Sequence, residues 1–319
     1  MDLDVLLPFH RIDKYFEQAI DSLSATKGIS FNTILIDDRL DKSQEIHSLV
    51  KSLKSFDIVR TDGGTGYSNA LQQGTTYINE DCVALFNSDD LIDPSRFQRQ
   101  IKELDIAELC ISKISRIKGN NLNSTSISGA IESKYYDPIY LLLGAYGADA
   151  SWCMRTEWWH QNAFFDDQDY LDWRIALKSF RKTTISYIPE VLYFYRKHNN
   201  QFTKNRVYNN SDLENTHKLW NMLAKSYGLP NFSFVLFSVF ATPWRNNSNA
   251  NISEIKYFIE HVEQIQQINS SEVAPYFKKL IRRRLLLLAR NNVNFFDKYW
   301  LVKQGFGELY PLILDVLNS

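Results

Sequence analysis

One short stretch constrains the fold more than any other, because an apolar run turns acidic at its end. Residues 83–86 are Val, Ala, Leu and Phe, a run that suits a buried strand and is too short for a helix. Residues 87–90, Asn-Ser-Asp-Asp, follow at once, and Asp93 with Pro94 fits the start of a helix. Carboxylates at the end of a buried strand are costly without a cation nearby. Ligands bind at the carboxyl ends of strands in open α/β sheets, so we expect a metal and a nucleotide diphosphate here; a capped polar turn is the alternative.

The first hundred residues alternate apolar runs with amphipathic stretches. Strands are expected near residues 4–8, 33–36 and 57–60 as well as at 83–86, with helices between them. This alternation predicts an α/β fold whose parallel strands are joined by right-handed crossovers. The second strand also ends in two acids, Asp37 and Asp38, and a glycine-rich loop at 62–66 follows the third. A nucleotide site across the strand ends accounts for all three features, whereas one capping turn accounts for one.

Composition excludes some partners. A net charge of −1 gives no bulk attraction to nucleic acid. The three cysteines, Cys82, Cys110 and Cys153, lack metal-binding or redox spacing and are expected as buried free thiols in a reducing compartment. Early charges argue against a signal peptide, and the longest apolar run, near residues 232–240, is too short to span a membrane. We therefore expect a soluble, cytoplasmic protein.

Four motifs, in the right order and on the right strands, resemble glycosyltransferase family 2. That family opens with a strand and Pro-x-Tyr/His-Asn/Arg, similar to residues 8–11, and its Val-Asp-Asp-Gly-Ser matches residues 36–40 at the first three positions. Its Asn-x-Gly-x-x-x-Ala-Arg-Asn-x-Gly is similar to residues 64–74, and its Asp-x-Asp-Asp matches residues 87–90 with Asn first. The resemblance implies a GT-A fold, a Rossmann-like, mostly parallel sheet flanked by helices, over residues 1 to about 200.

The resemblance also implies roles for single residues. Asp38 would accept a hydrogen bond from the base, and Asp89 would hold a divalent metal, Mn²⁺ or Mg²⁺, that bridges the diphosphate. Asn87 would bind the ribose or donor sugar instead of the metal, since an amide oxygen is a weaker ligand than a carboxylate. The nucleotide and donor site expected in this way comprises Pro8, His10, Arg11, Asp38, Gly66, Asn87, Ser88 and Arg196. Residues 147–152 are expected beside the donor sugar, where Trp152 could meet donor or acceptor hydroxyls; a structural role is the alternative.

A second acidic stretch resembles the family's catalytic motif. The family's Glu-Asp-Trp/Tyr-x-Leu-Trp-Leu-Arg is similar to residues 171–178, with Leu171 in place of Glu and Lys178 in place of Arg. Its aspartate is the catalytic base, which would be Asp172 here; Asp169 is the alternative register. Acids that favour a helix N-terminus would explain one or two aspartates, not the four found between residues 166 and 172.

The family often continues with Tyr-Arg-x-His, which matches residues 195–198. His198 would then be a metal ligand or a diphosphate contact, and a solvated loop histidine is the alternative. Arg196 could neutralise phosphate. From residue 205 the periodicity becomes helical, so we expect a GT-A domain at 1–204 and a helical C-terminal subdomain at 205–319. A basic amphipathic helix near Arg282–Arg284 is expected to present a solvated face, with peripheral contact to an anionic membrane as the alternative.

Together these features predict an inverting, metal-dependent glycosyltransferase. The expected donor is a nucleotide-diphosphate sugar, UDP-linked, and the expected acceptor is a hydroxyl of a carbohydrate or lipid-linked saccharide. The resemblance implies synthesis of bacterial surface polysaccharide or lipopolysaccharide, in the cytoplasm or at the inner face of the plasma membrane. One alternative is a nucleotidyltransferase that makes sugar nucleotides, although residues 8–11 are not the glycine- and lysine-rich loop of that class. The other is a non-catalytic protein that binds a sugar nucleotide, suggested by Asn87 and Leu171.

Overall fold

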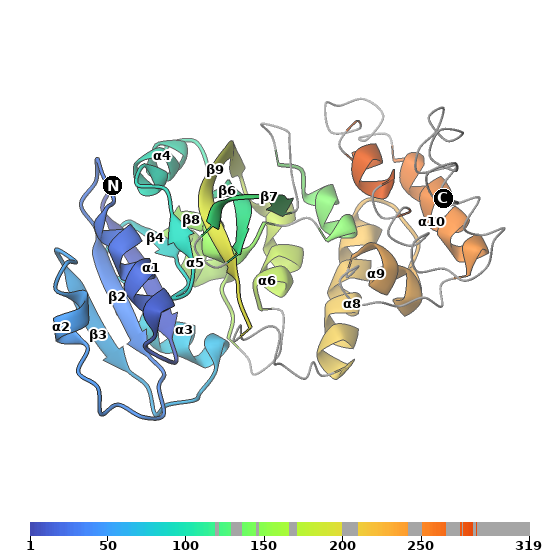
Figure 1. Cartoon of the computed structure of the whole chain (residues 1–319). Helices are drawn as coiled ribbons and strands as arrows, with labels where there is room; N and C mark the ends of the chain where they lie inside the picture. The colour runs from blue at the N-terminus through green and yellow to red at the C-terminus, as the bar shows by residue number, and fades with distance from the viewer. Residues whose placement is uncertain are drawn as a thin grey trace, which may run out of the picture. The chain divides into compact units, whose positions relative to one another are not determined.

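The computed structural model describes residues 1–118, 121–128, 136–144, 147–165, 171–199, 210–241 and 251–265, together with 275, 277–282 and 285. The chain divides into two compact units. The first comprises Met1–Tyr136 with Gly147–Leu213, and the second comprises Asp137–Tyr146 with Glu214–Ser319 (Figure 1). The expected boundary at residue 204 stays a prediction.

A mixed sheet forms the centre of the first unit. Within the described residues its strand order is β3-β2-β1-β4-β8-β6-β9-β5, and β7 pairs with β6. Strands β3, β2, β1 and β4 run parallel, as does the pair β6–β9, while β8, β5 and β7 pair antiparallel. The strands are β1 Leu3–Phe9, β2 Asn32–Asp37, β3 Phe56–Arg60, β4 Cys82–Leu85, β5 Leu91–Ile92, β6 Leu109–Lys118, β7 Asn121–Ser128, β8 Trp152–Arg155 and β9 Ile185–Lys197.

Helices cover both faces of the parallel part of this sheet, as the nearly continuous burial of its central strands requires. Val5 and Leu7 of β1 face the core that α1 closes with Phe16 and Ile20. On the other face, Gly74 of α3 lies so close to β2 that a β-carbon there would stand 2.2 Å from Ile36 Cδ1. The helices of this unit are α1 Lys14–Ser24, α2 His47–Val50, α3 Tyr67–Thr75, α4 Arg96–Glu103, α5 Thr156–Asn162 and α6 Leu171–Ser179, with 3₁₀ turns η2 Asp149–Ser151 and η3 Phe180–Lys182.

The structure confirms an α/β unit with its strands where the apolar runs stand, and it refines one region. The apolar stretches on either side of Pro189 and Glu190 form the single long strand β9. Its pairing with β6 shifts register where Ile188 faces Ser112 and Val191 faces Lys113. Pro189 lies in this shift, since proline has no N–H to give to the ladder. The three cysteines are free and buried, as expected.

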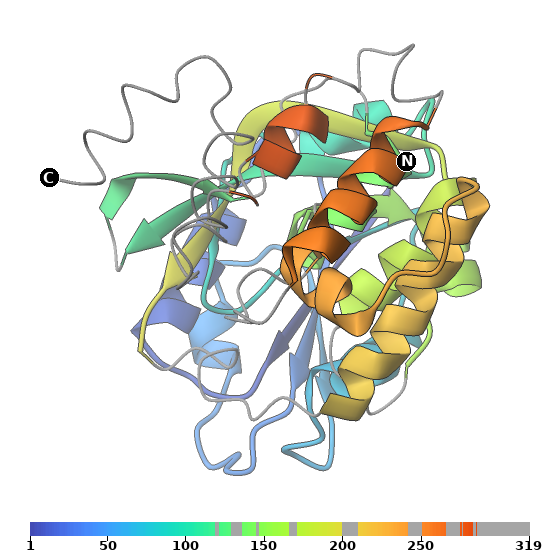
Figure 2. The same ribbon diagram turned by 90° about the vertical axis from the view of Figure 1, so that its right-hand side faces the viewer.

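The second unit is helical and is held together by aromatic side chains. It contains the 3₁₀ helix η1 Pro138–Leu143, most of α8 Asn210–Ser226, α9 Phe234–Phe240 and α10 Ile252–Glu263 (Figure 2). The ring of Phe258 stacks on Phe240 at 4.1 Å and on Trp220 at 6.1 Å, and Trp220 Nε1 donates to the Leu142 carbonyl at 3.2 Å. Helices therefore follow the sheet along the chain, as the periodicity predicted.

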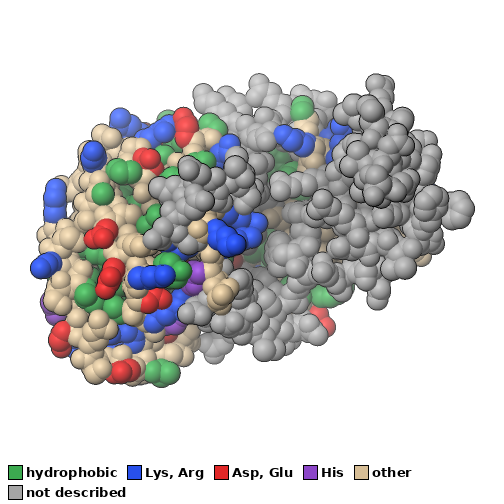
Figure 3. Space-filling view, viewed as in Figure 1, with side chains coloured by type: hydrophobic (Ala, Val, Ile, Leu, Met, Phe, Trp, Pro, Cys, Tyr) green, Lys and Arg blue, Asp and Glu red, His purple; other side chains and the backbone are tan. Residues whose placement is uncertain are grey.

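The basic segment near residue 282 is amphipathic where it is described. Phe277, Ile281 and Leu285 are buried, while Arg282 is exposed. Arg283 and Arg284 lie outside the described residues, so membrane contact by this helix stays a prediction. Among the described helices, none is both long and apolar enough to cross a membrane. On the first unit, charges of both signs are interspersed over the face in Figure 3, in keeping with a net charge of −1.

Candidate active site

The acidic turn after β4 holds two aspartates in different environments. Asp90 is fully buried, whereas the side chain of Asp89 keeps 26% of its exposure. Asp90 Oδ1 accepts from the backbone N–H of Arg196 at 2.7 Å, and Asp90 Oδ2 accepts from Tyr193 Oη at 2.5 Å and from Asn87 Nδ2 at 3.3 Å. Burial, and after it the charge of Asp89, raise the pKa of Asp90 well above its usual range. Of this pair, Asp89 is the carboxylate that faces outward and can meet a ligand.

The end of β9 lies against this turn. Arg196 Nε donates to the Asp89 carbonyl at 2.8 Å, and His198 Nε2 lies 2.9 Å from Asp89 Oδ2. The two side chains emerge on one side because residues 196 and 198 are two apart on an extended segment. Burial lowers the pKa of Arg196, and the charges of Asp90 and Asp89 partly restore it. The structure thus brings together Asn87, Asp89, Arg196 and His198, four residues that the sequence proposed for one site.

A buried arginine, Arg96, contacts residues next to the acidic turn. Arg96 is fully buried, and its pKa falls to about 10 through burial, so it stays charged at neutral pH. Arg96 Nη2 donates to the carbonyls of Leu85 at 3.1 Å and Trp152 at 3.3 Å, which lie at the end of β4 and the start of β8. Its guanidinium also lies 5.1 Å from the ring of Tyr193, the side chain that donates to Asp90. The sequence analysis missed Arg96; its place two residues after Pro94 gave no sign of burial.

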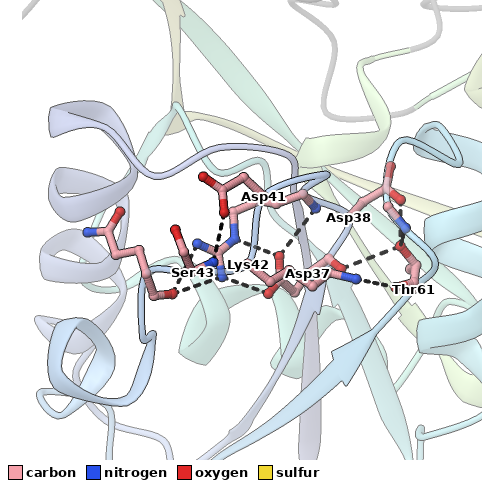
Figure 4. A network of polar contacts seen from close by, with 9 residues as sticks. Asp37, Asp38, Asp41, Lys42, Ser43 and Thr61 are labelled. Atoms are coloured by element: carbon pink, nitrogen blue, oxygen red, sulfur yellow. Dashed lines mark hydrogen bonds and ion pairs between the residues drawn. The ribbon is translucent and has the colours of Figure 1, made fainter.

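The two acids at the end of β2 differ in their partners (Figure 4). Asp37 is fully buried and pairs with Arg39, whose Nε and Nη2 donate to its two oxygens at 2.7 and 2.9 Å. Asp38 Oδ1 accepts from the Thr61 and Thr65 hydroxyls at 2.6 and 2.7 Å. Arg39 occupies the position where the family pattern has glycine, and it supplies the charge that a buried Asp37 needs.

Asp38 also fixes the glycine-rich loop. Its oxygens accept from the backbone N–H of Thr65 at 2.9 Å and of Gly66 at 3.0 Å. Burial alone would raise the pKa of Asp38, but its hydrogen bonds with Thr61, Thr65 and Gly66 outweigh burial and lower it. Gly66 has φ +88° and precedes α3, and a β-carbon there would meet no atom within 4 Å. The loop is therefore held in place while the space above Gly66 is open to a ligand.

The loop after β1 completes this edge of the sheet. Pro8 pairs with Ile36 near the end of β1, and His10 follows at an exposed position. Partial burial of the imidazole, followed by the charge of Arg11, lowers the pKa of His10 although Asp89 and Asp38 oppose this. Arg11 Nε pairs with Asp13 Oδ2 at 2.9 Å. Because β1 pairs in parallel with both β2 and β4, the carboxyl ends of these three strands lie at the same edge of the sheet.

Asp172 stands in the first turn of α6, and Asp169 lies outside the described residues. Tyr67 Oη donates to Asp149 Oδ2 at 2.6 Å. Burial and then Asp149 raise the pKa of Tyr67 well above its usual range, and Asp172 and Asp90 add to the effect. The contact between Tyr67 and Asp149 was not expected from the sequence.

The remaining two residues expected in the donor site are Trp152 and Ser88. Trp152 is fully buried, donates from Nε1 to the Gly147 carbonyl at 3.2 Å and packs against Phe180 at 5.4 Å. It is thus part of the core, and we do not include it in the donor site proposed below. Ser88 lies in the acidic turn with partial exposure.

The donor set fits a divalent cation that a substrate helps to bind. No group of three or more His, Cys, Asp or Glu side chains able to hold a metal occurs within the described residues. Mg²⁺ commonly binds through one or two carboxylates and takes its other ligands from phosphates and water. Asp89 offers such a carboxylate, and the buried Nδ1 of His198 has no hydrogen-bond partner. The site therefore suits a cation completed by a diphosphate, and it is not a closed protein cage.

Comparison with known proteins gives both a family and a fold. Residues 4–155 match the model of glycosyl transferase family 2. Among solved structures, S. aureus TarS 1–349 in complex with UDP-GlcNAc is 11% identical with a TM-score of 0.58, and the match covers 98% of this chain and 86% of that one.

The complex of the same TarS fragment with UDP is 11% identical at a TM-score of 0.56 and equal coverage. A further S. aureus TarS structure is 13% identical at a TM-score of 0.54, and the match covers 98% of this chain and 52% of that one. No match was found among curated protein sequences. With four family motifs placed along one edge of its sheet, residues 4–155 of this chain match glycosyltransferase family 2, and the chain has the GT-A fold.

Proposed function

We propose that this glycosyltransferase moves a sugar from a UDP-sugar to a hydroxyl of a saccharide or lipid-linked saccharide, with inversion at the anomeric carbon. One observation carries the proposal furthest: Asp89, partly exposed, meets His198 and Arg196 at the carboxyl end of β4. A carboxylate that contacts His198, with the Arg196 side chain bonded to the backbone carbonyl of the same residue, suits a metal-bound diphosphate. The TarS structures that share the fold hold UDP-GlcNAc and UDP, so UDP-GlcNAc is the first donor to test.

Different residues along this edge of the sheet would bind different parts of the donor. Asp38, with Gly66 and the 8–11 loop, would face the nucleoside. Asn87 and Ser88 would face the ribose or donor sugar. Asp89 and His198 would hold Mn²⁺ or Mg²⁺, which stabilises negative charge on the leaving diphosphate. Arg196 would contribute its positive charge beside the same diphosphate.

The chemistry needs one proton transfer and one displacement. Asp172 takes the proton of the acceptor hydroxyl, whose oxygen forms a bond to the anomeric carbon. The bond from that carbon to the diphosphate oxygen breaks at the same step, and UDP leaves with its electron pair. A positioned base contributes about 10²–10⁴-fold to such a rate. The acceptor, the choice between hexose and N-acetylhexosamine, and action at the inner face of a membrane are part of this proposal.

The test is release of nucleoside diphosphate from a panel of sugar nucleotides, with Mn²⁺, with Mg²⁺ and with chelator. We expect slow metal-dependent hydrolysis of one UDP-sugar by the wild type and none by Asp89→Ala. Asp21→Ala, at an exposed position on α1, is the matched control and should behave as wild type. Release of pyrophosphate would identify a nucleotidyltransferase instead. If the wild type binds no nucleotide with any metal, the proposal is wrong.

A further inference from the structure

The end of β9 has a backbone partner on one edge, where it pairs with β6 as far as Lys197. Strand β5 has two residues, and it pairs only through Leu91 with Phe194 and Ile92 with Tyr193. Arg196 and His198 lie beyond these pairs, yet both reach Asp89. On the edge that β5 leaves unpaired, a side chain takes over, because the Arg196 N–H donates to Asp90, and His198 lies one residue past the last pair with β6.

One such side chain comes from the first turn of α1. Asp13 caps that helix by accepting from the N–H groups of Tyr15 at 2.8 Å and Phe16 at 3.2 Å. Phe16 enters the core beside Phe9, with ring centroids 4.8 Å apart. The cap and the buried Phe16 fix the start of α1, and Tyr15, one residue earlier, is left half-buried beside the site.

The ring of Tyr15 contacts both residues at the end of β9. The guanidinium carbon of Arg196 lies 4.8 Å from the ring centroid, within the range of a cation–π contact. The imidazole of His198 lies 4.6 Å away, centroid to centroid, with 33° between the planes. Lys14 Nζ stands 5.1 Å from the same ring. One aromatic ring thus packs against two of the residues expected to meet the diphosphate and metal.

Asp90 holds the same segment from the other side. It accepts from the Arg196 backbone N–H and from Tyr193 Oη, as described above. Asp89, by contrast, meets the side chains of Arg196 and His198. The second aspartate of the turn is thus bonded to the strand, and the first is directed to the ligand.

We propose that Tyr15 and Asp90 are positioning residues that clasp the end of β9, so that Arg196 and His198 are set in place before a donor binds. This inference rests on the proposed function for its ligand, a metal-bound nucleoside diphosphate. Tyr15 acts through the face of its ring and Asp90 through its two oxygens. Neither residue touches the ligand, and both lower the cost of ordering the residues that do.

The experiment compares Tyr15→Leu with Tyr15→Phe in the full chain. We measure UDP binding by calorimetry at fixed Mn²⁺, hydrogen exchange of residues 193–199, and kcat and KM for the donor. Tyr15→Leu removes the aromatic face, so UDP should bind about three- to tenfold more weakly, the size of one cation–π contact. Exchange should quicken, and KM should rise more than kcat falls.

Two controls separate the ring from the fold. Tyr15→Phe keeps the aromatic face and should restore wild-type binding and exchange. Tyr77→Leu makes the same substitution at an exposed tyrosine outside the site and should change neither. Tyr193→Phe removes one bond to Asp90 without a change of shape, and exchange of residues 193–199 should quicken in this variant as well.

Two results would overturn the proposal that Tyr15 and Asp90 position the end of β9. One is a Tyr15→Leu protein with wild-type UDP binding and hydrogen exchange, and the other is a Tyr15→Phe protein as impaired as Tyr15→Leu. Failure of the proposed function can be told apart from failure of this inference, because the wild type would then bind no nucleotide. The exchange measurement tests the clasp in that case too, since it needs no ligand.

Discussion

His198 Nε2 and Asp89 Oδ2 lie 2.9 Å apart although 109 residues separate them in the chain. The contact joins the turn after β4 to the segment after β9, which brings the motif at residues 87–90 and the motif at residues 195–198 together. The His198 side chain keeps 4% of its exposure and that of Asp89 keeps 26%, so the pair is shielded on the histidine side and open on the carboxylate side.

Removal of the histidine should weaken metal binding. In His198→Ala, Asp89 loses its neighbour, and we expect the affinity for Mn²⁺ in the presence of UDP to fall about 10–100-fold, the usual effect of losing a ligand's support. Manganese binding followed by electron paramagnetic resonance measures this. His47→Ala is the control, since His47 is 64% exposed at 3.7 Å from Glu45. Equal affinities in His198→Ala and wild type would remove His198 from the metal site.

The base assignment predicts a rate effect without a binding effect. Asp172→Asn keeps the shape of the side chain but cannot take a proton, so kcat for sugar transfer should fall about 10²–10⁴-fold. UDP affinity should stay at the wild-type value because Asp172 lies in α6, outside the β4 turn that we propose as the diphosphate site. Single-turnover kinetics and calorimetry give the two quantities. Full activity in Asp172→Asn with loss of activity in Asp169→Asn would move the role to the alternative aspartate.

The buried pair at the end of β2 predicts a large change in stability. Arg39→Leu would leave the carboxylate of Asp37, which is fully buried, without its cation. The free energy of unfolding should fall by about 3–5 kcal/mol, as it does when one partner of a buried pair is removed. Arg99→Leu is the matched control: its pair with Glu190 is exposed, at 39% and 53%. Urea denaturation should show a change of only about 0–1 kcal/mol there. Similar losses in both variants would contradict the argument.

Asp38 predicts a dependence of stability on pH. Its pKa in the folded protein lies below the ordinary value of 3.8, because bonds from Thr61, Thr65 and Gly66 outweigh burial. A lowered pKa contributes stability that is present above the unfolded value and lost as the pH falls through the folded value. The difference in unfolding free energy between wild type and Asp38→Asn should thus be full at pH 6 and shrink below about pH 4. A difference that grows in acid would show the opposite shift. Asp62→Asn, at an exposed position, serves as the control.

Much of the fold of the first unit could be predicted from the sequence. Strands β1 to β4 stand where short apolar runs stand, since a buried strand needs four to eight such residues and a parallel sheet is covered on both faces. The acids after β2 and β4 could be assigned to one edge of the sheet for the same reason, because parallel strands end on the same side. These are local patterns with a fixed geometric consequence.

The hydrogen-bond and ion-pair partners of those acids could not be predicted from the sequence. Asp37 and Asp38 are adjacent, and only the fold gives one to Arg39 and the other to Thr61, Thr65 and Gly66. In the same way Asp89 faces outward while Asp90 is buried. Adjacent acids thus meet different partners, and which partners they meet depends on elements distant in the chain.

What the sequence determined by itself is therefore the family, the strand–helix alternation and the set of polar residues at one edge of the sheet. What the tertiary structure decided is which of them meet. Trp152 became core, Tyr15 came to pack on Arg196 and His198, and the charge of Arg96 lies buried under Tyr193. The physical reason is that hydrogen bonds and ring contacts act over a few ångströms. They join residues as much as 109 positions apart, and only the packed chain brings such residues within reach.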